Sequence, residues 1–260
     1  MTADQNSRPR VAIVMPAYNA EKTLEATLND IPEGCYEWLI VGDDCSQDGT
    51  VELAKKLGLD VVKTPENKGY GGNQKMIYRE ALERGADIVV MLHPDNQYDA
   101  RLIPYFTGFL ETGVCDVILG NRVQSRQACI KGGMPVWKYL SNRLLTIFLN
   151  MVFGTNQGEF HSGFRAYRRE VLETIPFEKN SDAFGFDAQF LAQSRWFGFK
   201  IANAPMPVRY FKEASSIRFW PSVRYGFVNL HAAFFYTLRK IGIRSKWFEK
   251  REPSTQEAQA

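Results

Sequence analysis

The stretch ADIVVMLHPDNQ, residues 86–97, constrains the fold more than any other part of this sequence. Its apolar run IVVML is rich in β-branched residues and too short for a buried helix, so it predicts a strand covered on both faces. Pro94 has no backbone N–H to continue a ladder, and the strand therefore ends where His93, Asp95 and Gln97 arrive together. Open α/β sheets bind ligands at the carboxyl ends of such strands. The sequence thus predicts a polar site at this sheet edge.

The spacing of Asp95 and Gln97 allows two interpretations. A carboxylate and an amide two positions apart can reach one divalent ion, which at such a place usually carries the phosphates of a nucleotide. Alternatively, Asp95 and Asn96 only satisfy their own backbone in a capped turn. The rest of the chain has to decide between a ligand site and a turn.

The sequence repeats the same strand-then-helix unit along its first half. Short apolar runs that end in turn residues alternate with helical segments, and four such units in a row predict an α/β fold with a doubly wound, mostly parallel twisted sheet flanked by helices. The expected strands lie at residues 11–15, 60–63, 88–92 and 116–122 and within EWLIV before Asp43, and the expected helices lie at residues 21–30, 73–84 and 100–111 and from residue 50 onward.

Polar and small residues also follow the neighbouring strands. Asp43 and Asp44 suit a turn or a helix cap, but their position at the same sheet edge as Asp95 favours a ligand role. Gly69 and Gly71 allow the backbone to approach a ligand closely, and the helix after them offers its N-terminus to anionic groups. A glycine-rich turn alone does not identify a nucleotide site.

Composition limits the partners and the compartment. The net charge of +3 is too small to indicate a nucleic-acid partner, and the four cysteines lack metal-binding spacing, which is typical of reduced cytosolic thiols. No segment has the roughly 18 uninterrupted apolar residues of a spanning helix. We expect a cytoplasmic protein whose membrane contact is at most peripheral, at the inner face of the cytoplasmic membrane.

The ordered set PAYN, VGDDCSQDGT, NKGYGG, the Asp-containing turn after VVML, GNR and SGFRAY resembles the inverting glycosyltransferases of family 2, over about residues 11–218. In pattern it is most similar to the dolichol- and polyprenyl-phosphate sugar transferases. The resemblance implies the GT-A fold and metal-assisted transfer, with Mg²⁺ or Mn²⁺, of a sugar from a nucleotide diphosphate sugar. It also implies inversion, and a polyprenyl phosphate or another cell-envelope molecule as the acceptor.

The resemblance assigns roles to the matching positions. It implies nucleotide binding by Pro16, Tyr18, Asn19, Asp43, Asp44, Gly69 and Gly71. The implied metal ligands are Asp95 and Gln97, and His93 and His161 are added candidates from their positions. The implied catalytic residues are Asp95, Arg122, Arg165 and Asp187. The expected acceptor-binding residues are Ser162, Arg209 and Lys212, of which the last two resemble a basic pair that steadies an acceptor phosphate or form a solvated basic loop.

Two departures from the family pattern keep alternatives open. Ala20 stands where an acid usually follows the PxYN motif, and His93 stands where the usual D-x-D-x-Q motif has its first acid. An imidazole does not supply the fixed negative charge of a carboxylate. A catalytically inactive nucleotide-sugar-binding protein is therefore one alternative, and a transferase that acts on a soluble hydroxyl acceptor is another.

Two later segments have the composition of surface or partner helices. An apolar stripe predicts an amphipathic helix that packs on the core or lies against a membrane or lipid acceptor. The stripe consists of Val136, Tyr139, Leu140, Leu144, Ile147, Phe148, Met151 and Val152. Residues 217–248 are aromatic and basic, and they predict a helical extension that packs on the catalytic domain, lies at an interface, or is exchanged between subunits of a homo-oligomer. The expected division is a disordered leader at 1–9, a GT-A catalytic domain at 10–216, this extension, and a disordered tail at 249–260.

Overall fold

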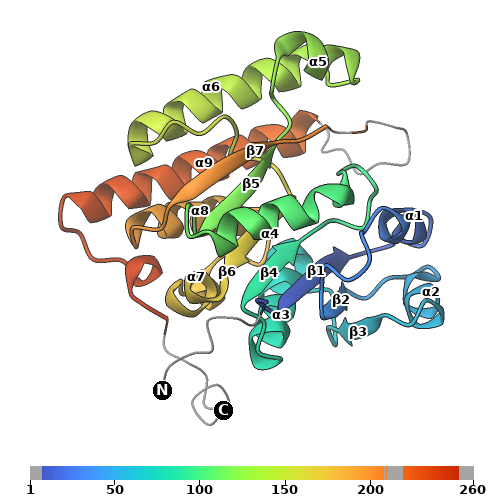
Figure 1. Cartoon of the computed structure of the whole chain (residues 1–260). Coiled ribbons are helices and arrows are strands. Elements are labelled where there is room, and N and C mark those ends of the chain that lie inside the picture. The colour runs from blue at the N-terminus through green and yellow to red at the C-terminus, as the bar shows by residue number, and fades with distance from the viewer. Residues whose placement is uncertain (1–7, 208, 210–218, 252–260) are drawn as a thin grey trace.

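The computed structural model describes residues 8–207, 209 and 219–251, which form a seven-stranded sheet with helices on both faces (Figure 1). The strand order is β3-β2-β1-β4-β6-β5-β7. All neighbouring strands are parallel except that β6 runs antiparallel to both β4 and β5. The predicted α/β class and the mostly parallel sheet are therefore confirmed. The strands are β1 (Val11–Ala17), β2 (Trp38–Asp43), β3 (Asp60–Lys63), β4 (Ile88–Met91), β5 (Val117–Asn121), β6 (Arg165–Arg168) and β7 (Ile201–Pro205).

The helices follow the predicted alternation, with additions after β5. Helix α1 is shorter than predicted, and the antiparallel strand β6 was not predicted. The α-helices are α1 (Leu24–Asn29), α2 (Thr50–Lys56), α3 (Gly69–Glu83), α4 (Ile103–Glu111), α5 (Arg126–Lys131), α6 (Val136–Phe153), α7 (Arg169–Thr174), α8 (Gly185–Trp196) and α9 (Phe219–Lys240). The 3₁₀ helices are η1 (Ala100–Leu102), η2 (Phe177–Lys179) and η3 (Lys246–Phe248). Most of the predicted leader (1–9) and tail (249–260) lies outside the described residues, and so does Lys212.

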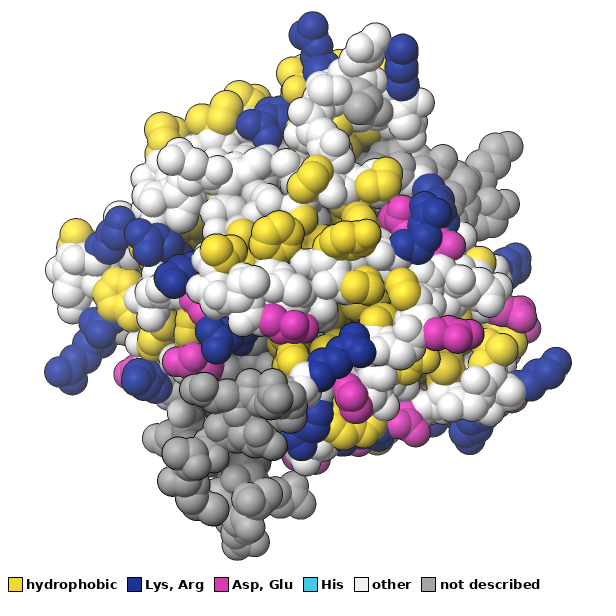
Figure 2. Space-filling view, viewed as in Figure 1, with side chains coloured by type: hydrophobic (Ala, Val, Ile, Leu, Met, Phe, Trp, Pro, Cys, Tyr) yellow, Lys and Arg dark blue, Asp and Glu magenta, His cyan; other side chains and the backbone are white. Residues whose placement is uncertain are grey.

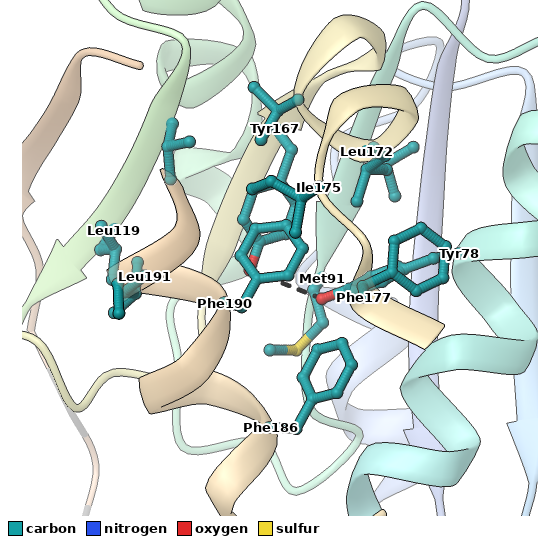
Figure 3. Close-up of a cluster of buried hydrophobic side chains, with 14 of the residues drawn as sticks. Tyr78, Met91, Leu119, Tyr167, Leu172, Ile175, Phe177, Phe186, Phe190 and Leu191 are labelled. Atoms are coloured by element: carbon teal, nitrogen blue, oxygen red, sulfur yellow. Dashed lines mark hydrogen bonds between the residues drawn. The ribbon is translucent and has the colours of Figure 1, made fainter. Parts of the chain in front are cut away.

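Strand β4 is buried on both sides, as its apolar run predicted. Val89 and Met91 point into one hydrophobic cluster, whereas Val90 and Leu92 belong to the cluster on the other face of the sheet. Figure 3 shows Met91 in the first cluster, beside aromatic side chains such as Phe186 from α8. Burial of each such aliphatic side chain contributes about 1.5–3 kcal/mol, so the strand end that carries the site is firmly anchored.

Helix α3 begins earlier than the glycine-rich sequence suggested. The prediction placed its start at Asn73, but the helix starts at Gly69. The reason is the carboxylate of Asp44, whose Oδ1 accepts from the amide of Lys68 at 2.7 Å and whose Oδ2 accepts from the amide of Gly69 at 2.8 Å. Two of the free N–H groups at the helix start are thereby satisfied.

Helix α6 exposes most of the apolar stripe that the sequence predicted. Its inward side carries Asn142, Thr146, Leu149 and Phe153, while Leu144 is 70% exposed. Tyr139, Phe148 and Val152 do pack against buried clusters. Core packing is therefore wrong as an interpretation of the remaining stripe residues, which are Val136, Leu140, Leu144, Ile147 and Met151.

The extension after the sheet is helical, as predicted. Helix α9 packs against α8 and α6, so these three helices form one layer on the same face of the sheet as α3 (Figure 1). Among the described helices, none combines the length and the apolar character needed to cross a membrane.

Candidate active site

A cavity of about 520 Å³ opens at the carboxyl edge of the sheet, where the sequence predicted a site. The turn after β4, the end of β5 and the segment before β6 form its polar floor, and α6 and α9 form two of its walls. Polar lining residues are Tyr70, His93, Asp95, Gln97, Tyr98, Arg122, Lys138, Ser141, Asn142, His161, Asp187, Ser222 and Tyr225. Apolar lining residues include Trp137, Leu144, Leu145, Phe148, Val223 and Leu230.

Tyr70, from the first turn of α3, connects His93 to Asp187. Its hydroxyl donates to Asp187 Oδ2 at 3.0 Å and lies 3.1 Å from Nε2 of His93. Burial, followed by the charge of Asp187, raises the pKa of Tyr70 well above its ordinary value, so the hydroxyl keeps its proton. Because that single proton goes to Asp187, the network assigns a proton to Nε2 of His93, which donates to Tyr70.

Asp187, predicted as catalytic, lies at the cavity but its carboxylate is already hydrogen-bonded. Oδ2 faces Tyr70 and is 3.1 Å from the Arg165 guanidinium, and Oδ1 accepts from Gln74 Nε2 at 3.2 Å. Arg165, also predicted as catalytic, is fully buried beneath Asp187 at the first residue of β6, where its Nε donates to the Ser162 carbonyl at 2.6 Å. Arg165 therefore positions Asp187 from below.

The predicted metal ligand Asp95 sits in a tight turn. Its Oδ1 accepts from the amide of Gln97 at 3.1 Å, and Asn96 between them adopts a left-handed conformation with φ 52°. Burial raises the pKa of Asp95, because desolvation disfavours the charged form. A cation would compensate this carboxylate, so Asp95 and the amide oxygen of Gln97 fit a hard divalent ion. The turn and the ligand interpretations are thus both consistent with this geometry.

The four predicted metal ligands all line the cavity, but they do not form a ready-made centre. Within the described residues, no group of three or more His, Cys, Asp or Glu side chains is arranged to hold a metal ion. His93 reaches Tyr70 through Nε2, and Nδ1 of His161 is 3.3 Å from the Tyr225 hydroxyl. Burial lowers the pKa of His161 to about 4, so its ring is neutral near pH 7. Its Nε2 is buried without a hydrogen-bond partner in the described structure.

Arg122, predicted as catalytic, is held by a buried carboxylate beside the cavity. Its Nε donates to Glu159 Oε1 at 2.8 Å, and its backbone amide donates to Glu159 Oε2 at 2.8 Å. Burial opposes ionisation of Glu159, but Arg122 outweighs it and keeps the pKa of Glu159 below its ordinary value. Lys138, at the start of α6, lines the same corner, and burial followed by Arg122 lowers its pKa. This corner of the cavity therefore carries two cations and one carboxylate.

Two of the predicted acceptor-binding residues, Ser162 and Arg209, are not among the residues that line the cavity. Ser162 is fully buried, and its hydroxyl oxygen accepts from the amide of Phe164 at 3.2 Å. Arg209 donates through one nitrogen to Asp30 Oδ2 at 2.7 Å and to Asn96 Oδ1 at 3.0 Å, so it secures the turn after β4. Lys212 lies outside the described residues.

Asp43 and Asp44 differ in what their carboxylates do. Both carboxylate oxygens of Asp44 already accept hydrogen bonds, because the side chain caps α3 and also accepts from the Thr64 hydroxyl at 3.0 Å. Asp43 accepts from the amide of Ser46 through Oδ1 at 3.3 Å, but its Oδ2 is buried and lacks a hydrogen-bond partner in the described structure. Of the two, Asp43 is therefore the carboxylate that keeps an unused hydrogen-bond acceptor.

The predicted glycine cradle approaches protein rather than open space. The amides of Gly71 and Gly72 donate to the carbonyl of Asp182 at 2.7 and 3.2 Å, and a Cβ on Gly71 would lie 2.2 Å from the Ser181 carbonyl oxygen. These glycines let the segment before α8 close over α3. Gly69 donates to Asp44, so neither predicted glycine offers a free amide to an anion.

The PAYN segment lies beside Asp43 at the end of β1. Pro16 is the sixth residue of that strand, and Tyr18 follows it with 54% of its surface exposed. Asn19 adopts φ 53° and accepts from the amide of Gln47 at 2.7 Å. The loops after β1 and β2 are thereby fastened together at the sheet edge.

Sequence reasoning missed several residues that line the cavity, including Tyr70, Lys138 and Tyr225. Tyr70 stands inside the NKGYGG motif that was singled out for its glycines, so a signal for it existed. Lys138 and Tyr225 belong to helices whose contact with the sheet edge depends on tertiary packing, and the sequence has no local signal for that contact.

The family model of glycosyl transferase family 2 matches residues 12–176, more than half of the chain, and the chain belongs to this family. A dolichyl-phosphate hexose transferase of Haloferax volcanii is 30% identical over 204 residues, which cover 76% of this chain and 82% of the relative. A low-salt glycan biosynthesis hexosyltransferase of the same organism is 26% identical over 257 residues, or 94% of this chain. That match spans only 60% of the longer relative.

Solved structures confirm the GT-A fold. Glucosyl-3-phosphoglycerate synthase from Mycobacterium tuberculosis, in complex with UDP, superposes with a TM-score of 0.68 at 22% identity, covering 92% of this chain and 82% of that chain. The same synthase was crystallised with Mn²⁺ and UDP-glucose, and that structure has a TM-score of 0.66 to this chain. At this identity the likeness establishes the fold alone.

Proposed function

We propose that this family 2 glycosyltransferase moves a sugar, with inversion, from a nucleotide diphosphate sugar to a polyprenyl phosphate at a membrane surface. The observation that carries the proposal is the composition of the cavity, whose polar floor continues into apolar walls from α6 and α9. A lipid with a phosphate head group matches both parts. The dolichyl-phosphate hexose transferase among the relatives supports the same acceptor class.

The phosphate of the acceptor would lie at the corner that contains Arg122 and Lys138. Glu159 holds the guanidinium of Arg122 in place, and Lys138 projects from the first turn of an 18-residue helix. Charge-assisted hydrogen bonds from such cations suit a phosphate. These residues replace Arg209 as the proposed acceptor contact, because they line the cavity whereas Arg209 lies outside its lining and holds Asp30 and Asn96.

The state of Asp187 also favours a phosphate acceptor. A hydroxyl acceptor needs a general base, whereas a phosphate is already ionised near pH 7. The carboxylate of Asp187 faces three donors, from Tyr70, Gln74 and Arg165, and would have to give up some of them to act as a base. Its proposed role is to fix the wall of the cavity beside the reacting groups.

The donor would be held at the opposite side, by Asp43 at the nucleoside and by Asp95 and Gln97 at the diphosphate. A bound Mg²⁺ or Mn²⁺ ion would offset the negative charge that develops on the leaving diphosphate. Asp95 and Gln97 are the proposed ligands, and the buried Nε2 of His161 is a further candidate. His93 is proposed to support the site through Tyr70.

The proposed setting follows from the acceptor. A polyprenyl phosphate resides in a bilayer, so the enzyme would work as a peripheral protein at the cytoplasmic face of the membrane. The catalytic domain would be residues 10–216, and the extension that contains α9 would complete its active site, because Tyr225 and Leu230 line the cavity.

The test compares acceptors and donors directly. A thermal-shift screen of UDP-, GDP- and other nucleotide sugars with Mn²⁺ identifies the donor. Transfer of the labelled sugar is then measured to undecaprenyl phosphate and to a soluble hydroxyl acceptor such as glycerate. We expect product only with the polyprenyl phosphate. Equal transfer to the soluble acceptor would contradict the proposal, and donor binding without any transfer would support an inactive binding protein.

A variant of Lys138 localises the acceptor phosphate. Lys138→Met keeps most of the aliphatic length but removes the charge, so we expect the apparent KM for undecaprenyl phosphate to rise by about tenfold or more, the equivalent of 1.4 kcal/mol. The KM for the donor should stay within about twofold. Lys56→Met, at an exposed position on α2, is the matched control. An equal effect on both substrates would exclude a specific acceptor role.

A further inference from the structure

Helix α6 is apolar on its outward side as well as on the side that packs against the protein. Leu144, Ile147 and Met151 lie on one stripe along the helix, and they are 70%, 50% and 71% exposed. The inward side carries both polar and apolar buried residues, such as Thr146 and Leu149. A helix that only covers the sheet would carry polar side chains on its outward side, because burial stabilises apolar side chains and exposure to water does not.

Helix α9 has the same feature. Phe227 and Phe234, seven positions apart on one side of the helix, are 68% and 57% exposed. The two exposed stripes belong to one region of the surface, because α6 and α9 pack against each other and both line the mouth of the cavity, through Leu144 and Leu230. A contiguous apolar surface of this kind marks an interaction site.

The charged side chains of the two helices and of the segments that flank them in the sequence are all basic. Residues 122–158 and 214–248 contain no Asp or Glu, although the chain has 29 acidic residues in all. In Figure 2, hydrophobic and basic side chains occupy the upper edge of the molecule over α5 and α6, and acidic side chains appear only lower down. Basic residues at the two ends of this surface are Arg126, Lys131, Arg239, Lys240, Arg244 and Lys246.

This combination distinguishes between possible partners. A second copy of the chain, related by two-fold symmetry, would place one basic rim against another, and like charges oppose such an interface. An anionic bilayer offers acyl chains to the apolar stripes and negative head groups to the basic rim.

We propose that the α6–α9 surface docks onto anionic phospholipid, with the mouth of the cavity held against the bilayer. Aromatic and aliphatic side chains such as Phe227 and Met151 enter the interfacial layer, and the flanking cations bind head groups. The inference extends the proposed function, because an acceptor lipid then reaches the cavity without leaving the membrane. It does not require that acceptor to be present for binding.

The test uses vesicles that contain no polyprenyl phosphate. Co-sedimentation of the full chain is measured with phosphatidylcholine vesicles and with vesicles that also contain 30% phosphatidylglycerol. We expect at least tenfold stronger partitioning onto the anionic vesicles, and its loss at high salt. Met151→Glu combined with Phe227→Glu should reduce partitioning at least tenfold. Both side chains are exposed and lie outside the cavity lining, so the variant should keep its fold and its donor affinity in solution.

The matched control is Tyr105→Glu combined with Phe109→Glu. These residues are 67% and 48% exposed on α4, on the opposite face of the sheet, and their replacement should leave partitioning unchanged. Equal loss in the control, or no binding of the parent to anionic vesicles, would overturn the proposal. A dimer in light scattering that the α6–α9 variant converts to a monomer would instead identify the surface as a subunit interface. These vesicles contain no polyprenyl phosphate. A negative result would therefore overturn the docking surface without bearing on the proposed transfer reaction, which the acceptor assay tests separately.

Discussion

The hydroxyl of Tyr70 lies 3.0 Å from Oδ2 of Asp187 and donates its only proton there. The Tyr70 hydroxyl oxygen is also 3.1 Å from Nε2 of His93, just after the central strand. One side chain therefore joins the wall proposed to face the acceptor to the turn proposed to hold the donor. A Cβ on Gly163 would come within 2.6 Å of the His93 ring, which shows how closely the neighbouring loop is fitted to this arrangement.

Replacement of Tyr70 by Phe tests this link. The ring should keep its stacking on Phe184, at a centroid distance of 5.1 Å, while Asp187 and His93 lose their common partner. Loss of a buried hydrogen bond to a charged group should cost about 1.5–3 kcal/mol of stability. We expect kcat to fall by about tenfold or more with little change in the donor KM. Tyr105→Phe, at an exposed site, should change neither quantity. Wild-type kcat in the Tyr70 variant would show that the hydroxyl has no positioning role.

Replacement of Asp95 by Asn tests the proposed metal site. The amide keeps the size of the side chain but removes the anionic ligand, so the affinity for the donor should lose its dependence on Mn²⁺. Calorimetric titration of the donor with and without Mn²⁺ measures this. Asp99→Asn, which affects a carboxylate bound to Arg101 outside the cavity lining, should keep the metal dependence. An unchanged metal response in the Asp95 variant would remove this residue from the site.

Replacement by Asn should lower the affinity for nucleotide at Asp43 and the stability of the fold at Asp44. In Asp43→Asn, the affinity for nucleotide should fall by about tenfold, while the free energy of unfolding of the unliganded protein should not decrease, because a buried oxygen without a partner loses its charge. In Asp44→Asn, the start of α3 loses charge-assisted caps, and stability should fall by about 1–2 kcal/mol. Isothermal titration and thermal unfolding separate the two effects. Loss of stability in the first variant would make Asp43 a structural residue.

The buried pair of Arg122 and Glu159 should make stability depend on acid pH. The pKa of Glu159 in the folded state is below its ordinary value of 4.5, so its contribution is fully present above pH 4.5 and is lost as the pH falls through the lowered pKa. Glu159→Gln should lose about 3–5 kcal/mol at pH 7, because the buried guanidinium loses its countercharge. The difference between parent and variant should shrink below pH 4. Melting temperatures across pH 3–8 measure both effects, and a difference independent of pH would argue against the pair.

Local patterns in the sequence predicted the sheet and the position of the site. The run before His93 determined a doubly buried strand, and Pro94 determined where it ends. The turn with the proposed metal ligands was predicted from two residues in one loop, and Asp95 and Gln97 do lie at the cavity. These features depend on residues that are neighbours in the sequence, so the sequence alone predicts them.

Contacts between segments that are far apart in the sequence could not be predicted from it. Arg209 pairs with Asp30, 179 positions away, and no pattern in either loop indicates that pairing. The helical periodicity of α6 identified an apolar stripe but not its direction, because the inward side is built from Asn142 and Thr146 as well as apolar residues. Asp44 was predicted to bind a ligand from its position at the sheet edge. Its role as a helix cap could not be predicted, because the amide of Lys68 that it accepts from lies 24 residues further along the chain.

Strand β6 connects the two groups of parallel strands in the sheet. Among the described strands, β5 and β7 join the rest of the sheet through β6, which pairs with β4 on its other side. Any opening that separates the two groups of strands must break one of these ladders. The amide protons of Ala166 and Tyr167 should therefore exchange with solvent as slowly as any in the protein, and their exchange rates report the cooperativity of the whole sheet.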